Sequence, residues 1–478
     1  MHILKKNKNI IFLLNVALIV IFYIIAFAIA FKTYMKGGGD WDFIAHWLWA
    51  RSITNSNFYS ALFNGHLANT ILYANSFYFE TLRAPLTGLI MAPFSIIGSS
   101  IGILLYFGLI IALLVYSLKY AAKHLNVNLL VLIALFLTPY TILFLLLLNG
   151  TEIVSMFLLV ILIVMIIKKE DKSGIILALA GLAKYTNLIF IPLLLLLPKK
   201  ERKKGFILFI LFSAPWLLFN LVVYGNPFFS YTISAGAFSN GGAGGYFPYA
   251  VIAQSLGIIL IDIIPAIIAL CIVLLIFYAK SNKKKITLKI IFAKLNKRAY
   301  KVIICAIALG LFGWFGTSAR GSINDLPRLG YLLYTTIGLF LAISFVDLIR
   351  SNTLKFSNFH KYAIVIFIGV YLLIDIFVFP YANYVFYGSN NIILIQAQQA
   401  ILARNMTNCN MISNNWVYLV YDGYKAHFPY YYNYTVEHYP IIYFTSLGSN
   451  QSVINFKNVS VTYNYSDFFI ELPKHYIC

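Results

Sequence analysis

The sequence predicts an all-α polytopic membrane protein of about eleven transmembrane helices, followed by a small C-terminal extracytoplasmic α/β domain. Hydrophobic residues make up 61% of the 478 residues and charged residues only 11%, whereas soluble domains carry about a quarter charged residues. Apolar runs of roughly 20 residues, the length that crosses a hydrocarbon core, recur along the chain. Lysine and arginine gather in the short loops between these runs, which is the pattern of cytoplasmic loops in membrane proteins.

The apolar runs give the expected membrane helices in order. The first run follows Lys5, Lys6 and Lys8 and exceeds the roughly 7–15 apolar residues of a signal peptide, so it predicts a retained anchor helix. Helices are expected near residues 10–31, 100–118, 128–148, 153–167, 205–224, 249–278, 302–318, 329–349 and 362–379. Residues 173–198 are apolar with lysine on both sides, which predicts a hairpin of two short helices with Lys184 near its turn.

The formal net charge of +21 does not indicate nucleic acid, because the basic residues lie in loops between membrane helices. The positive-inside rule places the N-terminus in the cytoplasm and the C-terminus outside. We expect a multi-pass protein of the plasma membrane. Membrane lipids are therefore the expected partners of this charge. The longest basic segment, residues 280–301, predicts either a solvated anchoring loop or a surface helix on anionic lipid.

The composition changes near Pro380, where asparagine, tyrosine and serine become frequent and long apolar runs stop. This change divides the chain into a membrane module, residues 1–379 with an external loop at 32–99, and an external domain, residues 380–478. Alternating apolar residues predict strands at 416–421 and 459–463, and residues 396–404 predict a helix.

The tail also carries signs of an extracytoplasmic location. Its N-x-S/T sequons indicate glycosylation on external surface loops. They lie at Asn405, Asn433, Asn450, Asn458 and Asn464. Cys409 and Cys478 form either a disulfide, as extracellular proteins allow, or two free thiols. Cys271 and Cys305 lie in predicted helices, where they are expected to be buried hydrophobes.

The first external loop gathers polar residues with chemical potential. Three glycines at 37–39 end the first helix, and Asp40 is a natural N-cap for a new one. Asp42 then falls in the first turn, and His46 lies four residues later on the same face. Tryptophans at 41, 47 and 49 are expected at the membrane interface. Asp-Trp-Asp also fits a D-x-D metal pattern, which leaves a metal requirement unknown.

Other polar groups are expected at the same membrane face. The loop ends with Glu80 and then residues 83–94, an apolar run with a proline near each end that predicts a re-entrant or interfacial element. Residues 149–152, ending in Glu152, predict an external turn. Arg320 and Arg328 either hold a phosphate or anchor helix ends at the interface.

Several of these segments resemble motifs of the GT-C membrane glycosyltransferases. Asp42-Phe43, aromatic Trp47 and Ala50-Arg51 are similar to a run in glycosyltransferase family 87, as is Phe58-Tyr59 after them. Residues 83–94 resemble the proline-rich element that follows in that family, although Ala84 stands where the first proline would be.

Two further segments extend the resemblance, which covers about residues 10–350. Residues 181–187, Gly-Leu-Ala-Lys-Tyr-Thr-Asn, resemble a hairpin of GT-C enzymes. Residues 216–230 and Arg328-Leu-Gly-Tyr331 are similar to the dolichyl-phosphate-mannose mannosyltransferases, although that branch usually has Arg-Tyr in sequence. The external tail matches no motif.

The resemblance implies an inverting transfer of a sugar, such as the hexose mannose, from a polyprenyl-phosphate donor to a glycan, lipid or protein acceptor. Asp42 is the expected general base, with Asp40 as the alternative. Basic residues would contact the donor phosphate, and other polar residues would line the site. The former are Arg83, Lys184, Arg320 and Arg328; the latter are His46, Glu80 and Glu152.

No cofactor is required by this interpretation, and no nucleotide-binding soluble domain is visible in the sequence, which favours a lipid-linked donor. Two alternatives stay open. One is a non-catalytic membrane scaffold that presents a glycosylated external domain. The other is a transporter, which intramembrane ionisable residues would support.

Overall fold

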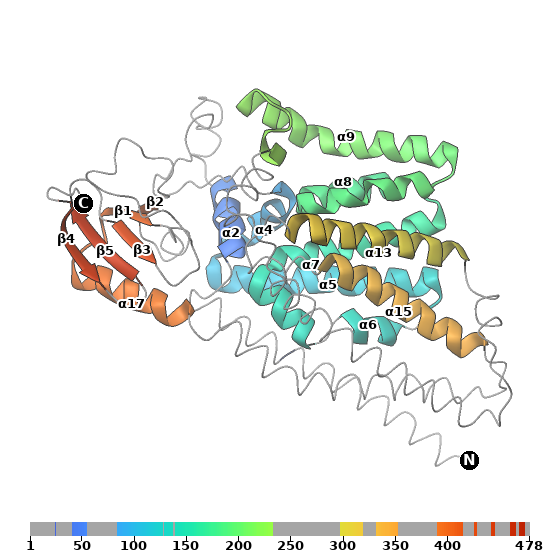
Figure 1. Cartoon of the computed structure of the whole chain (residues 1–478), viewed down its shortest axis with the longest axis horizontal. Coiled ribbons are helices and arrows are strands. Elements are labelled where there is room, and N and C mark those ends of the chain that lie inside the picture. Colours follow the sequence, from blue (N-terminus) through green and yellow to red (C-terminus); the bar gives the residue numbers. More distant parts are fainter. Residues whose placement is uncertain are drawn as a thin grey trace, which may run out of the picture.

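The computed structural model describes the backbone of twelve parts of the chain. They are residues 24, 41–54, 84–127, 129–136, 139–232, 297–318, 331–351, 390–413, 425–427, 441–444, 459–464 and 468–473. These residues are mostly helical (Figure 1). Two of their helices are long and apolar enough to cross a membrane, Ile101–Leu125 and Lys199–Val222. The number of eleven spans stays a prediction. The runs near 249–278 and 362–379 lie outside the description, as does the run near 10–31 apart from residue 24.

The helices form a bundle whose members lie side by side in Figure 1. In chain order they are α2 (Trp41–Ile53), α4 (Pro85–Ile97), α5 (Ser99–Leu125), α6 (Leu129–Phe136), α7 (Pro139–Lys168), α8 (Ser173–Ala183), the 3₁₀ helix η1 (Tyr185–Leu196), α9 (Lys199–Tyr224), α13 (Lys297–Ser318) and α15 (Tyr331–Ser351). Helix α7 is central, since it contacts α5, α8, α13 and α15. It is also deeply buried from Glu152 onward.

The predicted hairpin at 173–198 is confirmed. Helix α8 and the tighter η1 meet at Lys184 and pack against each other. Both ends of the hairpin lie beside Gly205 of α9, since the Asp171 carbonyl and the Leu197 side chain are neighbours of that glycine. A chain that returns to its starting side is what lysines on both flanks require.

Basic residues from separate parts of the chain meet at this end of the bundle. The Arg298 guanidinium, near the start of α13, donates to the Ile167 carbonyl at 2.8 Å, to Ile166 at 2.9 Å and to Leu196 at 3.2 Å. The C-terminal carbonyls of α7 and η1 have no partners within their own helices. Arg298 therefore joins three elements at the ends where the sequence places cytoplasmic loops.

The predicted external turn at 149–152 is wrong. Helix α7 is continuous from Pro139 to Lys168, so these residues lie within a helix, whereas α6 ends at Phe136, before the predicted turn. A single glycine costs a helix only about 1 kcal/mol, so Gly150 does not end it. Glu152 is fully buried, and its carboxylate tolerates this burial because it forms an ion pair with Lys184.

Two of the α2 tryptophans expected at the interface, Trp47 and Trp49, are buried instead, and the side chain of Trp41 lies outside the described residues. Trp47 is 0% exposed and Trp49 is 7% exposed, and two glycines on neighbouring helices provide room for their rings. A Cβ added at Gly88 of α4 would lie 1.6 Å from the Trp49 ring, and one at Gly102 of α5 would lie 3.0 Å from Trp47. The large rings therefore bind α2 to the bundle.

The tail contains a helix, α17 (Asn390–Ala403), and five strands: β1 (Asn410–Ser413), β2 (Lys425–His427), β3 (Ile441–Phe444), β4 (Val459–Asn464) and β5 (Phe468–Pro473). They form one sheet in the order β2-β1-β3-β5-β4. Strand β1 pairs in parallel with β2 and β3, and β5 pairs antiparallel with β3 and β4. The sheet lies beyond the end of the bundle nearest α2 (Figure 1).

Two secondary-structure predictions in the tail match these elements. The strand predicted at 459–463 falls in β4, and the helix predicted at 396–404 falls in α17. The strand predicted at 416–421 lies outside the described residues. Cys409 is buried and disulfide-bonded, but its partner is also outside them, so the pairing with Cys478 stays a prediction. Cys305 is a free cysteine that is half-buried and not fully buried as expected, and Cys271 lies outside the described residues.

Replacing Gly174 with alanine is expected to lower the stability of the protein. The new Cβ would lie 1.9 Å from the backbone oxygen of Gly205, so α8 and α9 would have to move apart, at a cost of about 1–3 kcal/mol. Gly108→Ala is the matched control, because a Cβ there meets nothing within 4 Å. Thermal unfolding in detergent should show a lower midpoint for Gly174→Ala only. Equal midpoints for the two variants would contradict this close helix contact.

Candidate functional site

Lys184 lies at the break between two short helices. Its backbone is extended, with φ −157° and ψ 125°, and its N–H still donates to the Ala180 carbonyl at the end of α8. A helix that stops inside a bundle leaves backbone groups without intrahelical partners. Side chains must therefore stabilise this break, and the surrounding residues do so.

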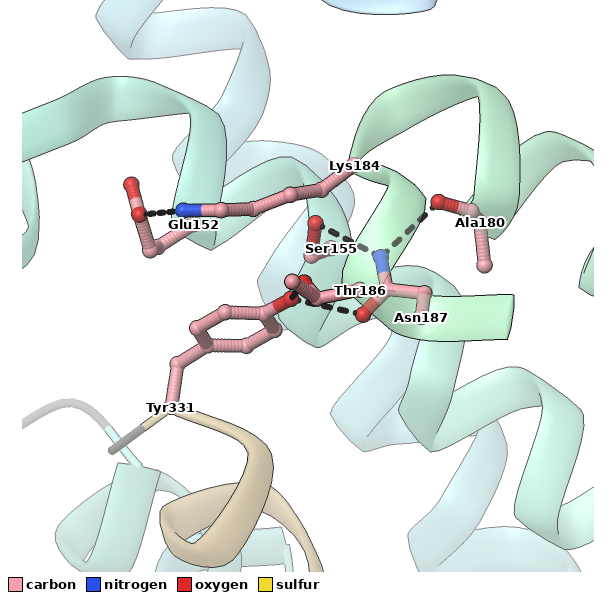
Figure 2. Close-up of polar contacts among 7 residues, drawn as sticks. All are labelled: Glu152, Ser155, Ala180, Lys184, Thr186, Asn187 and Tyr331. Atoms are coloured by element: carbon pink, nitrogen blue, oxygen red, sulfur yellow. Dashed lines mark hydrogen bonds and ion pairs between the residues drawn. The ribbon is translucent and has the colours of Figure 1, made fainter. Parts of the chain in front are cut away.

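Glu152 of α7 faces Lys184 and forms an ion pair with it (Figure 2). The Glu152 side chain is 0% exposed and the Lys184 side chain 17% exposed, so Glu152 is the more deeply buried of the two. The ammonium also lies over the Tyr331 ring, 5.4 Å from its centroid. The two charges stabilise each other, since either one alone would be costly at this depth.

Asn187 fixes the turn of the hairpin. Its amide nitrogen donates to Ser155 Oγ at 2.9 Å and to the Ala180 carbonyl at 2.8 Å. Its oxygen accepts a 2.7 Å hydrogen bond from the Tyr331 hydroxyl, which also lies 2.9 Å from Thr186 Oγ1. Figure 2 shows these groups beside the ion pair. The network joins α7, α15 and the hairpin, so hydrogen bonds to two other helices fix the turn that carries Lys184.

Tyr185, the next residue, contacts a different part of the protein. Its hydroxyl accepts a 3.0 Å hydrogen bond from Trp216 Nε1 of α9, and its ring lies 4.3 Å from that of Tyr231. Ser230 donates to Asn220 at 2.5 Å, which ties the segment after α9 back to that helix. At the helix break, Lys184 therefore contacts a charged residue of α7, and the next residue, Tyr185, contacts aromatic residues of α9 and the segment after it.

Helix α2, which carries Asp42 as its second residue, is connected to the same region. It packs against α4 and α7. The Phe43 ring lies 6.2 Å from that of Tyr106 on α5, which also packs against α7. His46 is buried at 4% exposure. The helix of the proposed base thus packs directly against α7, the helix that carries Glu152.

The structure brings together two of the predicted site residues, Lys184 and Glu152. The Asp42 backbone is placed in α2, but its side chain is outside the description. Several predicted residues lie wholly outside it: Asp40, Glu80, Arg83, Arg320, Arg328, Asn433, Asn450, Asn458 and Cys478. Of the other sequons, Asn405 is exposed just after α17 with φ 54°, and Asn464 is the last residue of β4.

Ser155, Thr186, Asn187 and Tyr331 were not predicted as site residues. Three of them fall within or beside quoted motif segments, since Thr186 and Asn187 end the run from Gly181 and Tyr331 ends the run from Arg328. These polar residues interrupt apolar stretches of the sequence, and that interruption is the feature that could have indicated a site. No group of three or more histidine, cysteine or acidic residues suited to a metal occurs among the described residues, and the metal requirement stays open.

Comparison with protein-family models, curated proteins and solved structures finds no match to this chain.

Proposed function

We propose that this protein is a multi-pass membrane glycosyltransferase that moves a sugar from a polyprenyl-phosphate donor to an acceptor hydroxyl on the extracytoplasmic face. The observation that supports this most is Lys184, whose side chain is partly exposed and forms an ion pair at a helix break inside an apolar bundle. A cation held there by Glu152 and over Tyr331 suits a lipid-linked phosphate, which arrives from within the membrane.

The reaction needs a base and an anion site but no general acid. The acceptor hydroxyl attacks the anomeric carbon and gives its proton to the Asp42 carboxylate. The bond between that carbon and the phosphate oxygen breaks, and the electron pair leaves with the phosphate. Positive charge then stabilises the leaving group. Lys184 supplies that charge, with Arg83, Arg320 and Arg328 as further proposed contacts.

The proposed topology has the basic end of the bundle in the cytoplasm and residues 380–478 outside as a glycosylated α/β domain. Arg298, the start of α9 and the Lys168 end of α7 lie at that basic end, as the positive-inside rule requires. Single cysteines placed within residues 199–204 are expected to resist a membrane-impermeant maleimide in intact cells. Cysteines placed within residues 405–478 should react. Labelling of the basic segment without permeabilisation would contradict the topology.

The proposed activity is tested with purified protein in liposomes. A polyprenyl-phosphate sugar and a set of glycan, lipid and peptide acceptors are supplied, and transfer of the sugar is followed by mass spectrometry. We expect a glycosylated acceptor and free polyprenyl phosphate in equal amounts. Release of sugar without an acceptor product, or no turnover with hexose and pentose donors alike, would contradict the proposal.

A transporter is the second candidate. A buried ion pair beside an interrupted helix is typical of substrate or ion pathways in transporters, and Glu152 and Lys184 form such a pair. The same liposomes discriminate the two functions, because a transporter would accumulate a solute without forming a glycosidic bond. A non-catalytic scaffold would do neither, and it leaves the buried pair unexplained.

A further inference from the structure

The proposed reaction changes the charge of the lipid carrier. The donor is a phosphodiester with one negative charge, and the product is a phosphomonoester with about −1.5 to −2 charge at pH 7. A lone buried ammonium attracts the product more strongly than the donor. Such a site would stay occupied by its own product, the polyprenyl phosphate, and the product would inhibit the enzyme.

The geometry around Lys184 opposes this attraction. An ammonium has three N–H donors, and Glu152 takes one of them, which leaves donors for a phosphate oxygen. Oxygens that share one ammonium lie about 4–5 Å apart, given hydrogen bonds near 2.8 Å. A phosphate on Lys184 would therefore lie close to the Glu152 carboxylate. Because the Glu152 side chain is 0% exposed and the Lys184 side chain is 17% exposed, an incoming ligand reaches the lysine side chain before the carboxylate.

We propose that Glu152 sets the charge selectivity of the Lys184 site, by cancelling the extra attraction that the ammonium would have for a phosphomonoester over a phosphodiester. The inference rests on the proposed function. Together the two side chains carry no net charge, so the second negative charge of the product gains little. Spent carrier then leaves the site, and fresh donor competes with it.

Among the described residues, two tyrosines near the ion pair do not replace this role. The Tyr331 ring of α15 lies 5.4 Å from the Lys184 ammonium, Tyr106 is on α5, which packs against α7, and both phenols are neutral near pH 7. Lys184 is the described cation that pairs with Glu152. At the separation above, one additional unit charge changes binding by roughly tenfold when the effective dielectric lies between those of protein and water.

The test measures binding without catalysis, using farnesyl phosphate and its methyl diester. Both are titrated into the purified full-length protein at pH 8 in detergent by calorimetry. The wild-type protein should bind the two ligands within about threefold of each other. Glu152→Gln keeps the shape but removes the charge, so it should bind the monoester about tenfold more tightly relative to the diester. In the transfer assay, polyprenyl phosphate should inhibit this variant correspondingly more strongly.

A second measurement needs only the wild-type protein, in case Glu152→Gln does not fold. The monoester gains its second charge with a pKa of about 6, whereas the diester does not titrate from pH 5 to 8. If Glu152 offsets that charge, the ratio of the two affinities stays nearly constant over this range. A roughly tenfold gain for the monoester from pH 5 to pH 8 would overturn the inference.

The failures are distinguishable. An unchanged ratio in Glu152→Gln, with binding lost in Lys184→Met, would overturn the role of Glu152 and leave the phosphate site standing. Failure of the wild-type protein to bind either ligand would overturn the phosphate site, and with it both the proposed function and the inference.

Discussion

Replacing Asp42 with asparagine is expected to lower sugar transfer by about 10²–10⁴-fold, the usual contribution of a positioned general base. Asparagine has nearly the same size but cannot accept the proton of the acceptor hydroxyl. Asp42 is the second residue of α2, and α2 is held to the bundle by Phe43, Trp47 and Trp49, all of which are buried. Folding should therefore be preserved, which thermal unfolding of the same preparation checks.

Asp40→Asn is the matched control for this experiment. The sequence predicts Asp40 as the N-cap of α2, which begins at Trp41, and asparagine caps a helix as well as aspartate does. A small effect is expected. An active Asp42→Asn protein with an inactive Asp40→Asn protein would reverse the two roles. If both proteins transfer sugar at the wild-type rate, neither aspartate is the base.

The sequence was most informative where the pattern depends on the membrane itself. Lysines on both sides of residues 173–198 require a chain that enters and returns on one side, and α8 and η1 do so. Helices α5, α9, α13 and α15 lie where apolar runs predicted them, and at least one end of each is within two residues of its prediction. Helix α5 runs seven residues further at its C-terminal end, and α9 and α13 begin six and five residues earlier, because these extensions carry the basic residues that flank the apolar runs. Apolar length and flanking charge act locally, so a single sequence reveals them.

The sequence was least informative where a residue depends on a partner far along the chain. Residues 149–152 looked like an external turn because Asn149 and Glu152 are polar, and nothing local shows that Lys184 lies beside Glu152. Trp47 and Trp49 of α2 were ambiguous in a similar way, because a tryptophan suits either an exposed membrane interface or a buried core. Their burial depends on Gly88 and Gly102 of other helices, which leave space that periodicity does not record.

Replacing Lys184 with methionine is expected to lower transfer by about 10²–10³-fold, as removal of one group that stabilises developing negative charge typically does. The variant should also be less stable. It leaves the Glu152 carboxylate buried without its cation, and breaking such a pair costs about 3–5 kcal/mol. The rate and the thermal midpoint must therefore be measured together, because loss of folded protein alone would also lower the rate.

The double variant Lys184→Met and Glu152→Gln separates the two effects. It removes both charges, and replacing a buried pair with neutral residues of similar volume is often close to neutral for stability. We expect the thermal midpoint to return toward that of the wild-type protein while transfer stays about 10²–10³-fold low, since a neutral site no longer stabilises the leaving phosphate. Recovery of both stability and transfer would show that the pair only holds α7 to the hairpin. In that case other cations must bind the donor phosphate. A Lys184→Arg variant, which keeps the positive charge, would then transfer sugar no faster than the double variant.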